Sequence, residues 1–121
     1  MTEQWPRDAS GQPFPTTFWV TCPHLVAALA RLEAAGGVER WSRSAREEPE
    51  LAASLERANR EQQSLRPDVP GGIGGSTRAG SIKCLHAHAA FALARPGYEL
   101  GERIVAEAAP LWPADRCCTS D

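Results

Sequence analysis

The residues that could bind a metal or act as nucleophiles gather in three short segments of this 121-residue chain. Lys83-Cys84-Leu85-His86-Ala87-His88 holds one of the four cysteines and two of the three histidines. Cys22 and His24 flank Pro23, and two adjacent cysteines lie near the C-terminus. Thiolate and imidazole groups together favour zinc over magnesium or calcium. The sequence therefore predicts zinc binding, in a structural or regulatory role, with ligands drawn from Cys22, Cys84, His86, His88, Cys117 and Cys118.

Thiol catalysis is a second hypothesis for the same residues. Cys22 and Cys84 both lie at predicted helix starts, where the helix dipole lowers the pKa of a thiol. A Cys–His pair, with either cysteine attacking and His86 or His88 as base, would suit a small phosphorylated or thioester substrate. No Asp or Asn that could orient such a base is evident near these residues. In a third hypothesis the cysteines are small buried apolar residues and the protein is an interaction module without chemistry.

The elements that must position these residues are predicted to be helices. Leu25, Leu29 and Leu32 recur at helical spacing after Thr21, a suitable N-cap, and the pair Gly36-Gly37 ends that helix. Pro49 suits the first turn of another helix, and Pro96 stops a later one. The expected fold is all-α, a small single domain (1–121) of four to five helices. The expected helices span residues 23–35, 38–46, 49–65, 81–94 and 99–109.

Three segments between and beyond these helices are expected to be irregular. Residues 1–13 are rich in polar residues and proline and predict a flexible arm, followed by an extended aromatic stretch at 14–21 whose rings would cover helix faces. Residues 66–81 form a Gly/Pro-rich loop, and residues 110–121 a C-terminal tail. The loop lacks the Gly-Lys-Ser/Thr of a phosphate-binding loop. We prefer to interpret this loop as a flexible connector or a close-packed turn. The alternative is an anion-binding nest of main-chain N–H groups, assisted by Arg78 and Lys83.

Charge and hydropathy limit the classes of partner. The formal net charge is −2 and the sequence pI is about 5.9, which gives no reason to expect nucleic acid or an anionic membrane as a partner, while a protein partner stays open. No apolar run approaches the ~20 residues of a membrane helix, and no signal sequence is recognisable. We therefore expect a cytoplasmic protein whose cysteines are thiols or metal ligands rather than disulfides.

Two motifs carry a resemblance to a known family. Phe14-Pro15-Thr16-Thr17-Phe18-Trp19-Val20-Thr21-Cys22-Pro23 and Ile82-Lys83-Cys84-Leu85-His86-Ala87-His88 resemble the bacterial domain-of-unknown-function family five hundred and one, over about residues 13–105. No activity is established for that family. The resemblance implies that Cys22, Cys84, His86 and His88 are the positions to test first. Because an aromatic or other residue is common at the position of His24, that histidine is discounted as a ligand.

Overall fold

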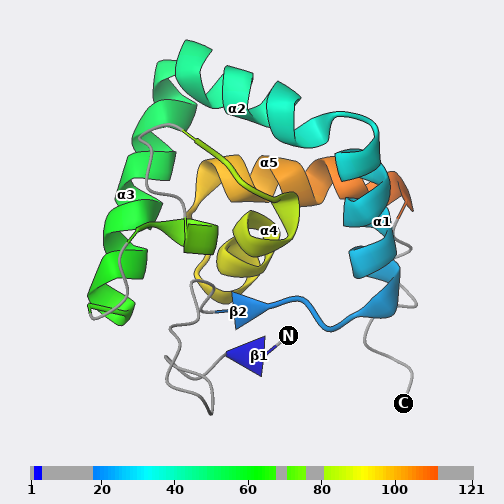
Figure 1. Ribbon diagram of the computed structural model, residues 1–121, viewed down its shortest axis with the longest axis horizontal. Helices are drawn as coiled ribbons and strands as arrows, with labels where there is room; N and C mark the ends of the chain where they lie inside the picture. Colours follow the sequence, from blue (N-terminus) through cyan, green and yellow to red (C-terminus); the bar gives the residue numbers. More distant parts are fainter. Residues whose placement is uncertain (1, 4–17, 68–70, 76–80, 112–121) are drawn as a thin grey trace.

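The structure is a computed structural model that describes residues 2–3, 18–67, 71–75 and 81–111, and all structural statements below concern these residues. Helices dominate them, so the predicted all-α class is confirmed (Figure 1). The elements in chain order are β1 (Thr2–Glu3), β2 (Phe18–Trp19), α1 (Pro23–Ala34), α2 (Gly37–Glu47), α3 (Pro49–Leu65), the 3-10 turn η1 (Ile73–Gly75), α4 (Leu85–Ala94), α5 (Glu99–Ala108) and the 3-10 turn η2 (Ala109–Leu111).

Helix α4 is the centre of the core. Every residue from Ala87 to Ala92 is buried, and so is Leu85 at its first position. A helix that is apolar around its whole circumference is stable only when neighbours enclose it. Helices α1 and α5, strand β2 and turn η1 all contact α4, which lies in the middle of the molecule (Figure 1). The segment that carries the Cys/His motif therefore enters the core directly.

Helices α1 and α3 pack through the apolar stripes that their sequences predict. In α1 the residues Leu25, Leu29 and Leu32 are buried, and in α3 the buried residues include Leu51 and Leu55. Burial of one leucine side chain contributes about 1.5–3 kcal/mol to folding, so these stripes account for much of the docking of both helices. Helix α3 spans the predicted range of 49–65. Helix α2 is one residue longer at each end than its predicted range, and α5 ends one residue earlier than predicted.

Two predicted boundaries need correction. Helix α1 has Cys22 rather than Thr21 at its N-cap position. Helix α4 begins at Leu85, four residues later than the predicted start at 81, because Cys84 is extended (φ −153°, ψ 154°). Helical spacing of apolar residues continues across this boundary, so periodicity alone could not find it.

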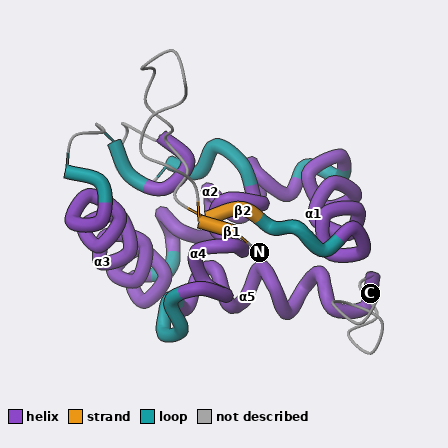
Figure 2. The backbone as a smooth tube through the Cα atoms, turned by 90° about the horizontal axis from the view of Figure 1, so that it is seen from below, coloured by secondary structure: helices purple, strands orange, loops and turns teal. Residues whose placement is uncertain are grey.

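The N-terminal arm contributes to the fold at its first residues. Thr2 pairs with Trp19 and Glu3 with Phe18 in an antiparallel two-residue ladder, so the prediction of a flexible arm over 1–13 is wrong at Thr2–Glu3. Residues 4–17 lie outside the described part of the chain. The Phe18 ring packs edge-on against Phe91 of α4 at 5.8 Å between centroids, as expected for an aromatic stretch that covers a helix face. Figure 2 shows both strands beside α4.

The described part of the Gly/Pro-rich loop is a close-packed turn against α3. The N–H of Ile73 donates to Oδ1 of Asn59 at 2.9 Å, and Ile73 itself is buried. A Cβ added at Gly72 would lie 2.2 Å from the same Asn59 oxygen, so only glycine fits there. Residues 68–70 and 76–80, which include Arg78, lie outside the described residues, as do residues 112–121 of the predicted tail. None of the described helices has the length and hydropathy needed to cross a bilayer.

Candidate functional site

The first turn of α4 is capped by a carboxylate from α1. The N–H of Leu85 donates to Oε2 of Glu33 at 2.7 Å, whereas the Cys84 side chain at the N-cap position makes no capping hydrogen bond. The first N–H groups of any helix lack partners within the helix, and the positive end of its dipole attracts an anion. Glu33 meets both requirements, so α1 determines where α4 begins.

His86 joins the same two helices. Its Nδ1 lies 3.0 Å from Oε2 of Glu33, and its Nε2 lies 3.2 Å from the main-chain oxygen of Val26. Both neighbours accept hydrogen bonds, so the ring donates to both when each nitrogen carries a proton. Use of His86 as a metal ligand or a base would require one of these contacts with α1 to break.

Cys84 is a half-buried free thiol beside the Glu33 carboxylate. Burial raises the pKa of this thiol above its ordinary value of 9.0, and the nearby negative charge of Glu33 raises it further, while the main-chain N–H groups of Ala87 and His86 act in the opposite direction. The expectation that a helix start lowers the pKa of Cys84 is therefore wrong. The reason is that desolvation disfavours the thiolate more than the helix end favours it.

His88 is buried in the core. Its Nδ1 lies 2.7 Å from the hydroxyl oxygen of Tyr98, and its Nε2 has no partner among the described residues. Complete burial lowers the pKa of His88 to about 4, so the ring is neutral at pH 7. Burial also raises the pKa of Tyr98, so its phenol stays protonated. The prediction that Cys84 and His88 share one face assumed that both lie within the helix, whereas Cys84 is extended and precedes it.

The predicted zinc ligands are thus divided among different surroundings. Cys22 is buried at the start of α1 and is disulfide-bonded, contrary to the expectation that the cysteines are thiols or ligands, so its sulfur is not available as a thiolate. Cys117 and Cys118 lie outside the described residues. Within the described ranges, no three His, Cys, Asp or Glu side chains come together in a group that could hold a metal ion. Zinc binding stays a prediction of the sequence.

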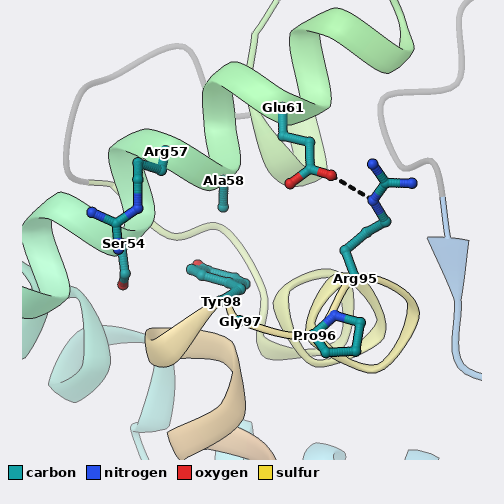
Figure 3. Close-up of a pocket in the computed structure, with 8 residues that line it drawn as sticks. All are labelled: Ser54, Arg57, Ala58, Glu61, Arg95, Pro96, Gly97 and Tyr98. Atoms are coloured by element: carbon teal, nitrogen blue, oxygen red, sulfur yellow. Dashed lines mark hydrogen bonds and ion pairs between the residues drawn. The ribbon is translucent and has the colours of Figure 1, made fainter.

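A pocket opens where the far end of α4 turns into α5. Its volume is about 190 Å³, and it lies between one face of α3 and the turn from Arg95 to Tyr98 (Figure 3). The turn closes tightly because Pro96 ends α4 and Gly97 takes a φ of +108°, which favours glycine. The lining residues are Ser54, Arg57, Ala58, Glu61, Arg95, Pro96, Gly97 and Tyr98.

Most polar groups that line this pocket already have partners inside the protein. The Ser54 hydroxyl donates to the main-chain oxygen of Leu51 at 2.9 Å, and the Gly97 N–H donates to Oε2 of Glu102 at 2.7 Å. The Tyr98 hydroxyl is the partner of the buried histidine of α4. These groups shape the wall, and they have little hydrogen-bonding capacity left for a ligand.

The charged groups of the pocket are distributed unequally. Nε of Arg95 donates to Oε2 of Glu61 in an ion pair between the turn and α3. Glu61 is also the i+4 neighbour of Arg57, but within the described chain Arg57 makes no hydrogen bond or ion pair. Figure 3 shows Arg57 and the Glu61–Arg95 pair on either side of the Tyr98 ring. Glu61 therefore pairs with Arg95, while Arg57 has no ion-pair partner among the described residues.

Glu33, Tyr98 and the charged pocket residues were not identified as functional residues from the sequence. Glu33 lies seven residues after Val26, so both residues lie on the same face of α1. This shared face is the sequence signal that could have identified Glu33 as a partner of the Cys/His motif. Tyr98 is the single tyrosine of the chain and directly follows the Pro96-Gly97 stop. The pocket has no comparable signal, because its residues come from two elements more than thirty positions apart.

Comparisons with known proteins give a family without an activity. A family model described as "Protein of unknown function (DUF501)" matches residues 2–71, a range that includes the aromatic motif at 14–23 and ends before the Cys/His motif at 83–88. Neither a curated protein nor a solved structure matches the chain.

Proposed function

Because the chain belongs to DUF501, a family of proteins of unknown function, we propose from its geometry alone that it is a binding module for an anionic group, held in the pocket between α3 and the α4–α5 turn. One observation carries this proposal. Arg57 lies exposed at the pocket without an acidic partner in the described chain, since Arg95 has taken the carboxylate of Glu61.

The hydrogen-bonding inventory of the pocket supports an acceptor as ligand. The unused donors belong to Arg57 and to the terminal nitrogens of Arg95, whose Nε alone pairs with Glu61. A guanidinium presents its N–H groups in a planar fork that matches the oxygens of a carboxylate or a phosphate. A ligand with acceptor oxygens and negative charge would use these donors, whereas a neutral alcohol or sugar would gain less.

The rest of the wall suits a small apolar body. Ala58, Pro96 and the ring of Tyr98 contribute carbon atoms to the lining. A volume of about 190 Å³ is below the ~300–1,000 Å³ of pockets for drug-sized ligands. The pocket is therefore suited to a single side chain, a chain terminus or a small aromatic acid.

The Cys/His motif favours a structural role in this proposal. His86 contacts α1, His88 contacts Tyr98 of the pocket wall, and Cys84 is held as a protonated thiol. The motif thereby connects the α1–α4 contact at one end of α4 to the pocket at the other end. The hypotheses of a zinc site and of a thiol enzyme stay predictions of the sequence, and the arrangement of these side chains lends them no support.

A titration with benzoate tests the proposal. We expect saturable shifts of the amide resonances around Ser54–Glu61 and Arg95–Tyr98, with a Kd on the order of 1 mM for a ligand of this size. Arg57→Gln should weaken binding about tenfold, as expected when a charge-assisted hydrogen bond is lost. Arg60→Gln is the matched control, since Arg60 is exposed on the same helix, pairs with Glu56 and does not line the pocket. Equal affinity in both variants, or shifts elsewhere, would contradict the proposal.

A further inference from the structure

We infer, on the premise of the proposed function, that Glu61 sets the charge selectivity of the pocket, so that it accepts a monocarboxylate in preference to a phosphate dianion. Glu61 lines the pocket and compensates one of its two arginines. Selectivity between two anions is a difference of affinities, and a group that disfavours one of them contributes as much as a group that attracts the other.

The ion pair between Glu61 and Arg95 limits the positive charge that a ligand can use. Nε of Arg95 donates to Oε2 of Glu61, and the two side chains are 45% and 38% exposed. Among the charged lining residues, Arg57 has no ion-pair partner within the described ranges. One guanidinium fork matches one carboxylate in both charge and geometry, since two parallel N–H groups meet two oxygens.

For a phosphate monoester, the balance of charge between ligand and pocket is different. Near pH 8 it carries two negative charges, because its second pKa is about 6. Arg57 can neutralise one of them, while the charge of Arg95 is already compensated by Glu61, whose carboxylate repels the second charge. Removal of the Glu61 charge would free Arg95, and the pocket would then carry a guanidinium group without an ion-pair partner on either side of the Tyr98 ring.

Benzoate and phenyl phosphate form a probe pair that tests this inference, because both place the same phenyl ring against the apolar wall. At pH 8 and constant ionic strength we expect the native protein to bind benzoate at least tenfold more tightly than phenyl phosphate. In Glu61→Gln the preference for benzoate should fall at least tenfold, through a gain in affinity for phenyl phosphate. Glu56→Gln, an exposed change on the same helix outside the pocket, should leave the ratio as in the native protein.

A double variant identifies the second cation. Glu61→Gln combined with Arg95→Gln should lose the gain for phenyl phosphate, because the freed guanidinium is no longer present. Arg95→Gln alone should weaken the binding of benzoate at least fivefold, since the charge of Glu61 is then uncompensated. This measurement tests the inference even if Glu61→Gln does not fold. An unchanged ratio in Glu61→Gln, or a native preference for phenyl phosphate, would overturn the inference while leaving the proposed function standing. If the native protein binds neither probe, the proposed function fails with it.

Discussion

Glu33 of α1 accepts the main-chain N–H of Leu85 at 2.7 Å, so the first turn of α4 is capped by a residue 52 positions earlier in the chain. The same Oε2 atom lies 3.0 Å from Nδ1 of His86. A single carboxylate therefore holds both the main chain and a side chain of the Cys/His motif. This arrangement makes the start of the central helix dependent on the docking of α1, rather than on a capping residue of its own.

Removal of the Glu33 carboxylate should destabilise the fold by a measurable amount. Glu33→Ala leaves the Leu85 N–H and the His86 ring without their acceptor, and we expect a loss of about 1–3 kcal/mol in the free energy of unfolding. Urea denaturation at pH 7 measures this loss. Glu56→Ala, which removes an exposed carboxylate in an i,i+4 ion pair, should cost no more than about 0.5 kcal/mol. A similar cost for both variants would refute the capping role.

Gly101 should not tolerate a methyl group. A Cβ at this position would lie 2.7 Å from the main-chain oxygen of His88 and 2.8 Å from Cβ of Ala92, so α4 and α5 approach each other through Gly101. Gly101→Ala should therefore cost about 1–3 kcal/mol, because neither neighbour can rotate away. Thermal unfolding followed by circular dichroism provides the measurement. Ala53→Ser, which adds one atom at an exposed position of α3, should stay within about 0.5 kcal/mol of the native protein.

Stability should fall as the pH is lowered, in part because of His88. The pKa of His88 is about 4 in the folded protein against an ordinary value of 6.5, so between these values the unfolded chain binds a proton that the folded protein does not. The contribution of the neutral ring is complete above pH 6.5 and is lost progressively towards pH 4. The shift corresponds to a loss of up to about 3 kcal/mol.

The measurement for His88 is a set of urea denaturation curves from pH 7.5 to pH 4. His88→Asn removes the titrating ring and keeps a polar group near the position of Nδ1, so its stability should depend less on pH over this interval than that of the native protein. Acidic residues titrate in both proteins, and the difference between the two profiles isolates His88. Parallel profiles would show that His88 is not held neutral by burial.

Cys84 should react slowly with alkylating reagents. Because burial and the charge of Glu33 raise its pKa above 9.0, little thiolate exists at pH 7.5, and carbamidomethylation without reductant should be slower than for a free cysteine. Glu33→Gln should speed the reaction by lowering that pKa. Mass spectrometry of the peptide that contains Cys84 gives the rate as a function of pH. A midpoint below 8.5 would instead favour the thiol-enzyme hypothesis.

The helices could be predicted from the sequence because their determinants are local. The leucine stripe of α1, with Pro23 in its first turn, and the stripe of α3 after Pro49 require only helical periodicity and backbone constraints. The burial of α4 follows similarly from a run without polar positions other than its two histidines. The sequence also singled out the Cys/His motif as the segment to test first, although it did not predict the contacts of its histidines with Glu33 and Tyr98.

The tertiary structure decided everything that depends on contacts between distant residues. Helix α4 starts at Leu85 because the acceptor for its first N–H comes from α1. His86 and His88 have different surroundings because one ring meets Glu33 and the other meets Tyr98. Arg57 has no partner in the part of the chain that the structure describes, because Arg95 of the α4–α5 turn pairs with the carboxylate one helical turn away from Arg57. Sequence periodicity describes each helix separately, whereas these partners are chosen by how the helices pack.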